Sequence, residues 1–137
     1  MAQLFIWDSS KYETKITQMD DEHKKLVEIM NRLATKNYEN ATRDELTTVI
    51  EELSNWTIMH FEHEESYLKQ INFAGLDNHK NIHKRLLFQF NQHKIAFIDS
   101  GATKISEKFF EFLNLWLSAH IQHIDMQYCP SKQKKTG

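Results

Sequence analysis

The chain has 137 residues, with 17 Lys or Arg against 19 Asp or Glu, and its formal charge of −2 argues against a general binder of nucleic acid. This length suits one domain with a sizeable core, and three glycines and one proline leave few breaks in long helices. The N-terminus lacks the features of a signal peptide, and no apolar run reaches the length of a membrane span. A single cysteine, Cys129, fits a reducing compartment, so we expect a cytoplasmic protein that contacts neither membrane nor nucleic acid.

The order of apolar residues predicts an N-terminal arm followed by four amphipathic helices. Residues 1–18 carry scattered aromatic residues without a sustained period, and the first helix is expected to begin near Asp20, whose charge suits a helix N-terminus. Thr42 and Glu45 have the pattern of a capping box. A second helix of about 27 residues should follow it through Gln70.

The third helix is expected to use Asp77 as its N-cap and to end at residues 99–101, while Thr103 caps the fourth helix and Pro130 stops it. Short links between four such helices predict an all-α fold, an antiparallel up-down-up-down four-helix bundle with an irregular N-terminal arm. We expect this single domain to span residues 1–130 and residues 131–137 to form a flexible tail.

His60 and Glu64 interrupt the apolar face of the second expected helix. Because they are four residues apart, they lie on one face, about 6 Å apart along the axis, and both can reach one metal ion. Taken alone, the pair favours a structural explanation, in which the two side chains hydrogen-bond each other or turn to solvent. The other three helices reverse that interpretation, because each also carries ligand-type residues.

Four helices together supply a candidate set of metal ligands. The set is His23, His60, Glu64, His79, His83, His120 and Asp125. A core with so many polar groups would be unstable without a cation. Asp125 follows His120 by five residues, about 140° round an ideal helix from its face. A local helix distortion or a sideways reach is therefore needed to bring Asp125 into the site.

The remaining histidines, His63, His93 and His123, have no partner that completes the pattern, and we interpret them as surface or helix-end residues. Glu65 lies one position round the helix from Glu64, so replacing it is expected to have little effect on metal binding.

The number of candidate ligands favours two metal ions over one. Seven side chains are too many for a single tetrahedral ion. Two six-coordinate ions that share both carboxylates and one solvent-derived oxygen would use all of them and leave one position open. Di-iron oxygenases built on helix bundles use more carboxylates than this set contains. Five neutral imidazoles leave the metals less electron-rich, which favours reversible binding of oxygen over cleavage of the O–O bond.

Four motifs in the chain resemble the hemerythrin family, specifically its single-domain bacterial members. The motifs are Asp20-x-x-His23-Lys24-x-Leu26, His60-Phe61-x-x-Glu64-Glu65, His79-x-x-x-His83 and Trp116-Leu117-x-x-His120-Ile121-x-x-x-Asp125-x-x-Tyr128. The resemblance runs from Trp7 to Tyr128. It implies a four-helix bundle around a non-haem di-iron site that binds dioxygen reversibly.

The resemblance also implies a cofactor and residue roles. The cofactor would be two non-haem iron ions with a bridging oxo or hydroxo group. The closed iron would be held by His79, His83 and His120, the open iron by His23 and His60, and both would be bridged by Glu64 and Asp125. The positions that match the oxygen pocket of the family are Phe61, Trp116, Leu117 and Ile121.

The leading hypothesis is a monomeric protein, not an enzyme, that binds dioxygen for storage, transport or delivery, with a transient protein partner in the case of delivery. A second is an oxygen or nitric oxide sensor or delivery adaptor that acts on a separate partner protein. A third is a di-iron enzyme that consumes peroxide or nitric oxide, and a fourth is simple metal storage. No general acid or base stands out beyond the ligands, which argues against the enzyme.

Overall fold

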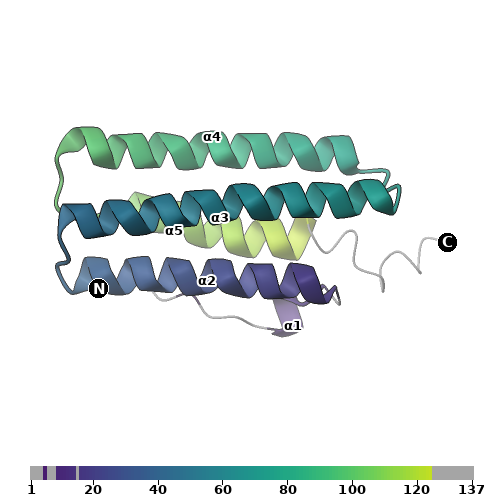
Figure 1. Ribbon diagram of the computed structural model, residues 1–137, viewed down its shortest axis with the longest axis horizontal. Helices are drawn as coiled ribbons and strands as arrows, with labels where there is room; N and C mark the ends of the chain where they lie inside the picture. The colour runs from purple at the N-terminus through teal and green to yellow at the C-terminus, as the bar shows by residue number, and fades with distance from the viewer. Residues whose placement is uncertain (1–4, 6–8, 15, 125–137) are drawn as a thin grey trace.

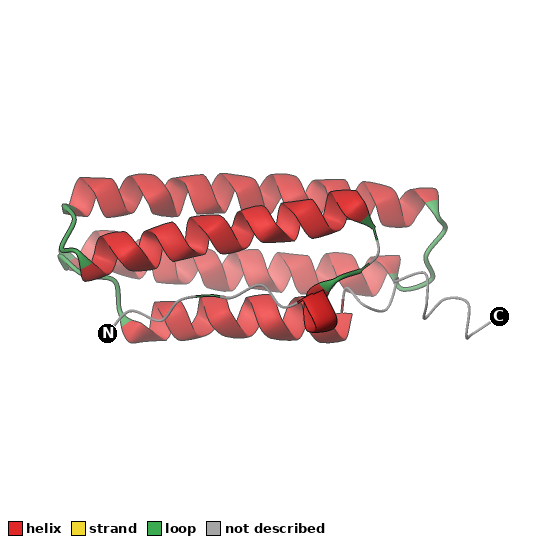
Figure 2. Ribbon diagram, turned by 90° about the horizontal axis from the view of Figure 1, so that it is seen from below, coloured by secondary structure: helices red, strands yellow, loops and turns green. Residues whose placement is uncertain are grey.

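The computed structural model describes residues 5, 9–14 and 16–124, and for residues 9, 11 and 121–124 only the backbone. The elements are α1 (Ser9–Tyr12), α2 (Thr17–Tyr38), α3 (Arg43–Gln70), α4 (Leu76–Ser100), α5 (Glu107–Leu115) and the π-helix η1 (Trp116–Ile124). The helix α5 continues directly into η1, so the two form one arm of the bundle (Figure 1). The predicted all-α four-helix bundle is confirmed, and the described part of the chain contains no strand (Figure 2).

Two predicted helix ends are confirmed. Thr42 accepts a hydrogen bond on its hydroxyl from the Glu45 amide at 3.1 Å, and the Glu45 carboxylate accepts one from the Thr42 amide at 3.2 Å. This capping box satisfies amides that have no partner within the helix. Gly101 ends α4 in the left-handed conformation, with φ of 71°. Glycine adopts that conformation without the steric cost that a side chain adds.

Two predicted caps are wrong. The helix α4 begins at Leu76 without a side-chain cap, so Asp77 lies inside its first turn. The fourth arm is capped by Ser106, whose hydroxyl accepts from the Phe109 amide at 3.2 Å, and not by Thr103. The later start has a tertiary cause: the Asn37 side chain accepts a hydrogen bond from the Ile105 amide at 2.8 Å and ties that residue to α2 ahead of the helix. The predicted stop at Pro130 lies outside the described residues.

The N-terminal arm packs on the bundle as expected, but it is not wholly irregular, because it contains the one-turn helix α1. Phe5 is buried in the core, and its carbonyl accepts a hydrogen bond from the Asn31 side chain at 2.7 Å. Near α1, the buried Asp20 carboxylate accepts from both the amide and the hydroxyl of Thr14, each at 2.8 Å. These polar contacts fix the arm alongside α2.

The described side chains form two apolar clusters in the interior. The larger fills the half of the bundle near the α2–α3 and α4–α5 connections and includes Leu33, Ile50 and Phe109. The smaller lies at the opposite end, where Met19 and Leu68 are buried and other apolar residues cover them. The histidines of the predicted site lie at this second end, so a polar layer interrupts the apolar interior.

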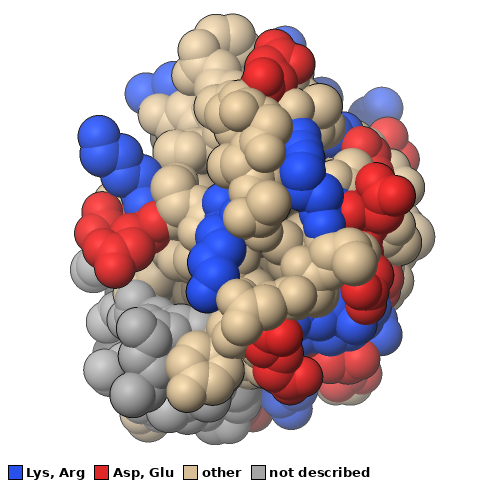
Figure 3. Space-filling model, turned by 90° about the vertical axis from the view of Figure 1, so that its left-hand side faces the viewer, with Lys and Arg blue, Asp and Glu red and all other residues tan. Residues whose placement is uncertain are grey.

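On the end face shown in Figure 3, positive and negative side chains are interspersed without a field of one sign. Among the described helices, none combines the length and apolar character needed to cross a membrane.

His93, expected at the surface, instead lies partly buried, with its ring 5.3 Å from that of Phe109 and 5.0 Å from that of Phe112.

Candidate metal centre

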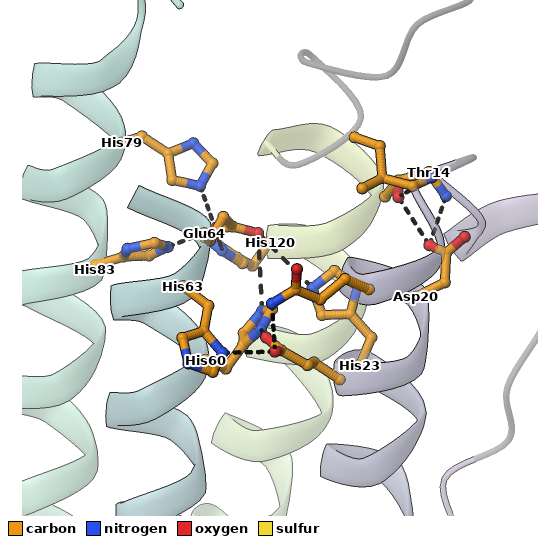
Figure 4. Close-up of polar contacts among 12 residues, drawn as sticks. Thr14, Asp20, His23, His60, His63, Glu64, His79, His83 and His120 are labelled. Carbon is orange, nitrogen blue, oxygen red and sulfur yellow. Dashed lines mark hydrogen bonds and ion pairs between the residues drawn. The ribbon is translucent and has the colours of Figure 1, made fainter. Parts of the chain in front are cut away.

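Six of the seven candidate ligands meet in the interior of the bundle, and they come from all four of its arms (Figure 4). They are His23 from α2, His60 and Glu64 from α3, His79 and His83 from α4, and His120 from η1. Each of these side chains is at most 5% exposed. The pairs spaced by four residues share a helix face, which is why each helix presents them together.

One oxygen of the Glu64 carboxylate faces three imidazoles. Its Oε1 lies 2.6 Å from Nε2 of His79 and 2.8 Å from Nε2 of His83. Nε2 of His120 is 3.8 Å from the same oxygen. These four residues form a group whose ligand atoms all lie within 4.8 Å of one another.

The other oxygen of Glu64 faces the remaining two imidazoles. Its Oε2 lies 3.7 Å from Nε2 of His60 and 3.9 Å from Nε2 of His23. The three residues form a second group of potential ligands within the same 4.8 Å limit. Glu64 therefore belongs to both groups and offers one oxygen to each, as a carboxylate that bridges two cations would.

The electrostatic environment keeps Glu64 ionised. Complete burial alone would raise the pKa of its carboxyl, because charge is costly in an apolar interior. The interactions with His120, His79 and His83, together with the charge of His60, outweigh burial and hold the pKa well below its ordinary value. The site therefore contains a buried anion that attracts cations.

The fourth arm contains a helix distortion, one of the two ways in which the spacing of His120 and Asp125 could be accommodated. Its backbone changes to a π-helix at Trp116, four residues before His120. A π-helix bonds residue i to residue i+5, so residues five apart come close to a common face. Asp125 itself lies outside the described residues, and its place among the ligands stays a prediction.

Phe61, one of the predicted pocket residues, lies against imidazoles of both groups. Its ring stacks on that of His83 at 3.7 Å with an interplanar angle of 2°, and its centroid lies 6.0 Å from that of His60. The Trp116 ring meets the Phe61 ring edge-on at 5.9 Å. Phe61, Trp116 and Leu117 are each at most 5% exposed, and the side chain of Ile121 lies outside the described residues.

Comparison with known proteins identifies the family. The model of the hemerythrin HHE cation-binding domain matches residues 14–131. The chain belongs to the hemerythrin family. The confirmed resemblance therefore covers all the candidate ligands, including Asp125.

Relatives of this hemerythrin-family chain span nearly its whole length. A bacteriohemerythrin of Clostridium acetobutylicum is 30% identical over 128 residues, which cover 91% of this chain and 98% of the relative. A bacteriohemerythrin of Methylococcus capsulatus is 27% identical over 93% of this chain and 95% of the relative. The crystal structure of a wild-type hemerythrin superposes with a TM-score of 0.82 at 26% identity, over 95% of this chain and 98% of the other.

Two further carboxylates were missed by the sequence analysis. Glu22 accepts a hydrogen bond from Nδ1 of His60 at 2.6 Å, and Glu65 accepts one from Nδ1 of His83 at 2.7 Å. Glu65 therefore contacts a candidate ligand, while the expectation that its replacement has little effect on metal binding stays a prediction. Each acid directly adjoins a candidate ligand in the sequence, and a ligating histidine needs an acceptor for its second ring nitrogen, so this signal was present.

An apolar pocket of about 280 Å³, open to the surface, lies between α4 and the fourth arm. It is lined by Ile82, Leu86, Gln89, Phe112, Leu115, Trp116, Ala119 and His120. Trp116 and His120 connect the pocket wall to the candidate metal centre. The pocket gives a small apolar molecule space beside the centre.

Proposed function

We propose that this protein binds dioxygen reversibly at a non-haem di-iron centre, for oxygen storage, transport or delivery. The observation that carries the proposal is the position of Glu64, which faces three imidazoles with one oxygen and two imidazoles with the other. Imidazole and carboxylate together suit iron. The unequal numbers of imidazoles would leave one ion with an open position.

The donor set fits two iron ions. His79, His83 and His120 would hold one of them, His23 and His60 the other, and Glu64 and Asp125 would bridge both. When bound, the iron pair supplies the electrons and the open coordination position that dioxygen binding needs. The protein supplies fixed imidazoles and an interior from which water is excluded.

The apolar residues beside the imidazoles determine which molecules reach the centre. Phe61 covers His83 and approaches His60, and Trp116 packs against the Phe61 ring. Together with Leu117 and Ile121, they would admit a small apolar molecule and exclude water and anions. Exclusion of water and anions slows irreversible oxidation of the iron, so these residues favour release of dioxygen over its consumption.

The proposal includes a monomer in the cytoplasm, with dioxygen as its ligand and a separate protein as the recipient where oxygen is delivered. The chain would then act as a carrier and not as an enzyme.

Metal analysis combined with optical spectroscopy tests this function. Protein purified from iron-replete cells should contain about two irons per chain, as the two groups of ligands require. The reduced protein should develop a visible absorption band when oxygen is admitted and lose it under vacuum. One zinc and no iron per chain, or a spectrum that oxygen does not change, would contradict the proposal.

A further inference from the structure

The outer nitrogen of His60 is fixed by a carboxylate that lies outside the group of candidate ligands. Glu22 Oε1 is 2.6 Å from Nδ1 of His60. Because an ionised carboxylate only accepts, the ring donates through Nδ1, and in the neutral form that binds a metal the lone pair is therefore on Nε2. That Nε2 is the atom that faces Glu64. Glu22 therefore selects the tautomer of His60 that can bind a cation in the interior.

Glu22 is itself held from several sides. Its second oxygen accepts hydrogen bonds from Nδ1 of His63 at 2.6 Å and from the Gln18 amide at 3.2 Å. The Trp56 indole donates to the Glu22 backbone carbonyl at 3.2 Å. Figure 4 shows that the imidazoles of His60 and His63 lie close to each other. A side chain with so many partners has little freedom to release the ring that it orients.

The hydrogen-bonded series from His60 through Glu22 to His63 reaches the surface in two steps. His63 is 43% exposed, whereas the Glu22 side chain is 10% exposed and that of His60 only 1%. The acid on the other group of imidazoles, Glu65, bonds His83 and is 27% exposed. Thus each group contains at least one imidazole backed by a carboxylate, and Glu22, on the group with fewer histidines, is more enclosed than Glu65.

We propose that Glu22 is a positioning residue of the metal centre, acting through His60, and that His63 fixes Glu22 in the orientation this requires. The inference rests on the proposed function, since it assumes that His60 binds iron. Backing by a carboxylate orients a metal-bound imidazole and increases its basicity. Replacement of Glu22 therefore weakens one iron position and leaves the other unchanged.

Glu22 also connects α2 to α3 through its hydrogen bonds to His60 and His63. The competing explanation of these bonds is that they only hold the two helices together and have no role at the metal. The same two helices offer a matched control. Arg32 donates two hydrogen bonds to the Glu52 carboxylate, at 2.6 and 2.8 Å, and neither residue belongs to the two groups of candidate ligands. Glu52→Gln removes charge from an α2–α3 bridge just as Glu22→Gln does.

The test titrates the full-length, metal-free protein with Fe²⁺ under anaerobic conditions, in competition with a chelator. Wild-type protein should bind two equivalents. Glu22→Gln should weaken one equivalent by about 10- to 100-fold, the usual effect of losing such a partner, and leave the other unchanged. Glu52→Gln should bind both equivalents as wild type does. The reduction potential should rise in Glu22→Gln only, because a less basic imidazole favours Fe²⁺.

His63→Ala provides a second variant at an exposed position, where folding is not at risk. It should weaken the same equivalent by a smaller factor, and combined with Glu22→Gln it should add no further loss. Wild-type affinities in both Glu22→Gln and His63→Ala would overturn this inference alone. Affinity losses that merely follow the unfolding temperature of the metal-free protein, in Glu52→Gln as well, would also overturn it. A wild-type protein that binds no iron would overturn the proposed function together with the inference.

Discussion

Near the α2–α3 connection the interior of the bundle is filled by side chains such as Leu33, Ile50 and Phe109, whereas the same helices at the opposite end bury five imidazoles together with carboxylates that include Glu64. Apolar burial stabilises the first end without any ligand, by about 1.5–3 kcal/mol for each large side chain. Burial of polar groups costs free energy unless they are paired or bind a cation. The comparison indicates that one end maintains the fold while the other is built for a metal.

The small apolar cluster beyond the histidines supports this division. Met19 and Leu68 are buried at the far side of the polar layer, with Phe73 and Leu76 packed against them. The candidate metal centre is therefore enclosed between apolar residues along the bundle as well as across it. The desolvation that makes an unpaired anion costly also strengthens its attraction for cations.

Removal of the shared carboxylate should have the largest effect. Glu64→Ala takes away an oxygen from each group of ligands, and we expect loss of most bound iron and a lower unfolding temperature of the iron-loaded protein, because metal-binding energy is also folding energy. Elemental analysis and thermal unfolding would measure both. Glu62→Ala, an exposed change on the same helix, is the control and should retain two irons. Two irons retained in Glu64→Ala would show that the carboxylate is dispensable.

A cavity at the apolar end should affect stability and not metal content. Leu53 is fully buried, and Leu53→Ala should lower the free energy of unfolding by about 2–5 kcal/mol, with or without iron. Denaturant unfolding gives the free energy, and elemental analysis of the folded protein should still show two irons per chain. Iron loss as large as in Glu64→Ala would contradict the division between an apolar end that stabilises the fold and a polar end that binds metal.

Low pH should lower the stability of the fold mainly through the end of the bundle that contains the candidate metal centre. The folded-state pKa values of Glu64 and Glu22 are lowered, so their contribution to stability is present above the usual carboxyl pKa, about 4.3, and is lost as the pH falls through the folded-state values. Unfolding of the metal-free protein between neutral pH and pH 3 would show this loss. Glu64→Gln, which cannot titrate, should have a flatter pH dependence. An unchanged pH dependence in that variant would exclude Glu64 as a source of acid sensitivity.

Enlarging the pocket should have the smallest effect on metal content and a selective effect on chemistry. Leu117 is 3% exposed beside Trp116, and Leu117→Ala should let water and anions approach the iron while the ligands remain. We expect two irons per chain and faster conversion to the oxidised form that no longer binds oxygen. Absorption spectra recorded over time under air would measure the rate. A rate equal to that of wild type would show that Leu117 does not exclude water.

Much of the fold and of the candidate metal centre could be predicted from local sequence. The Thr42–Glu45 capping box, the Gly101 helix end and the meeting of six candidate ligands follow from helical spacing and cap chemistry, which act over a few residues. The five-residue spacing of His120 and Asp125 predicted a distorted helix or a sideways reach of Asp125, and a π-helix is present at Trp116–Ile124.

The failures have tertiary causes. Ser106 replaces Thr103 as a cap because Asn37, 68 residues before Ile105, holds the Ile105 amide. Glu22 reaches His60 across 38 residues of sequence, and no local pattern indicates which of several acids accepts from a given imidazole. Contacts of this kind depend on how the helices pack, and helical periodicity does not specify them.

Gas stoichiometry over repeated cycles tests the central claim most directly, because it asks whether the polar end holds a reversible oxygen site. Reduced, iron-loaded protein should take up one dioxygen for every two irons, release it under vacuum and repeat this over several cycles with the same stoichiometry. Sustained consumption of oxygen without recoverable gas would contradict the account and would identify the centre as that of an oxygen-consuming enzyme.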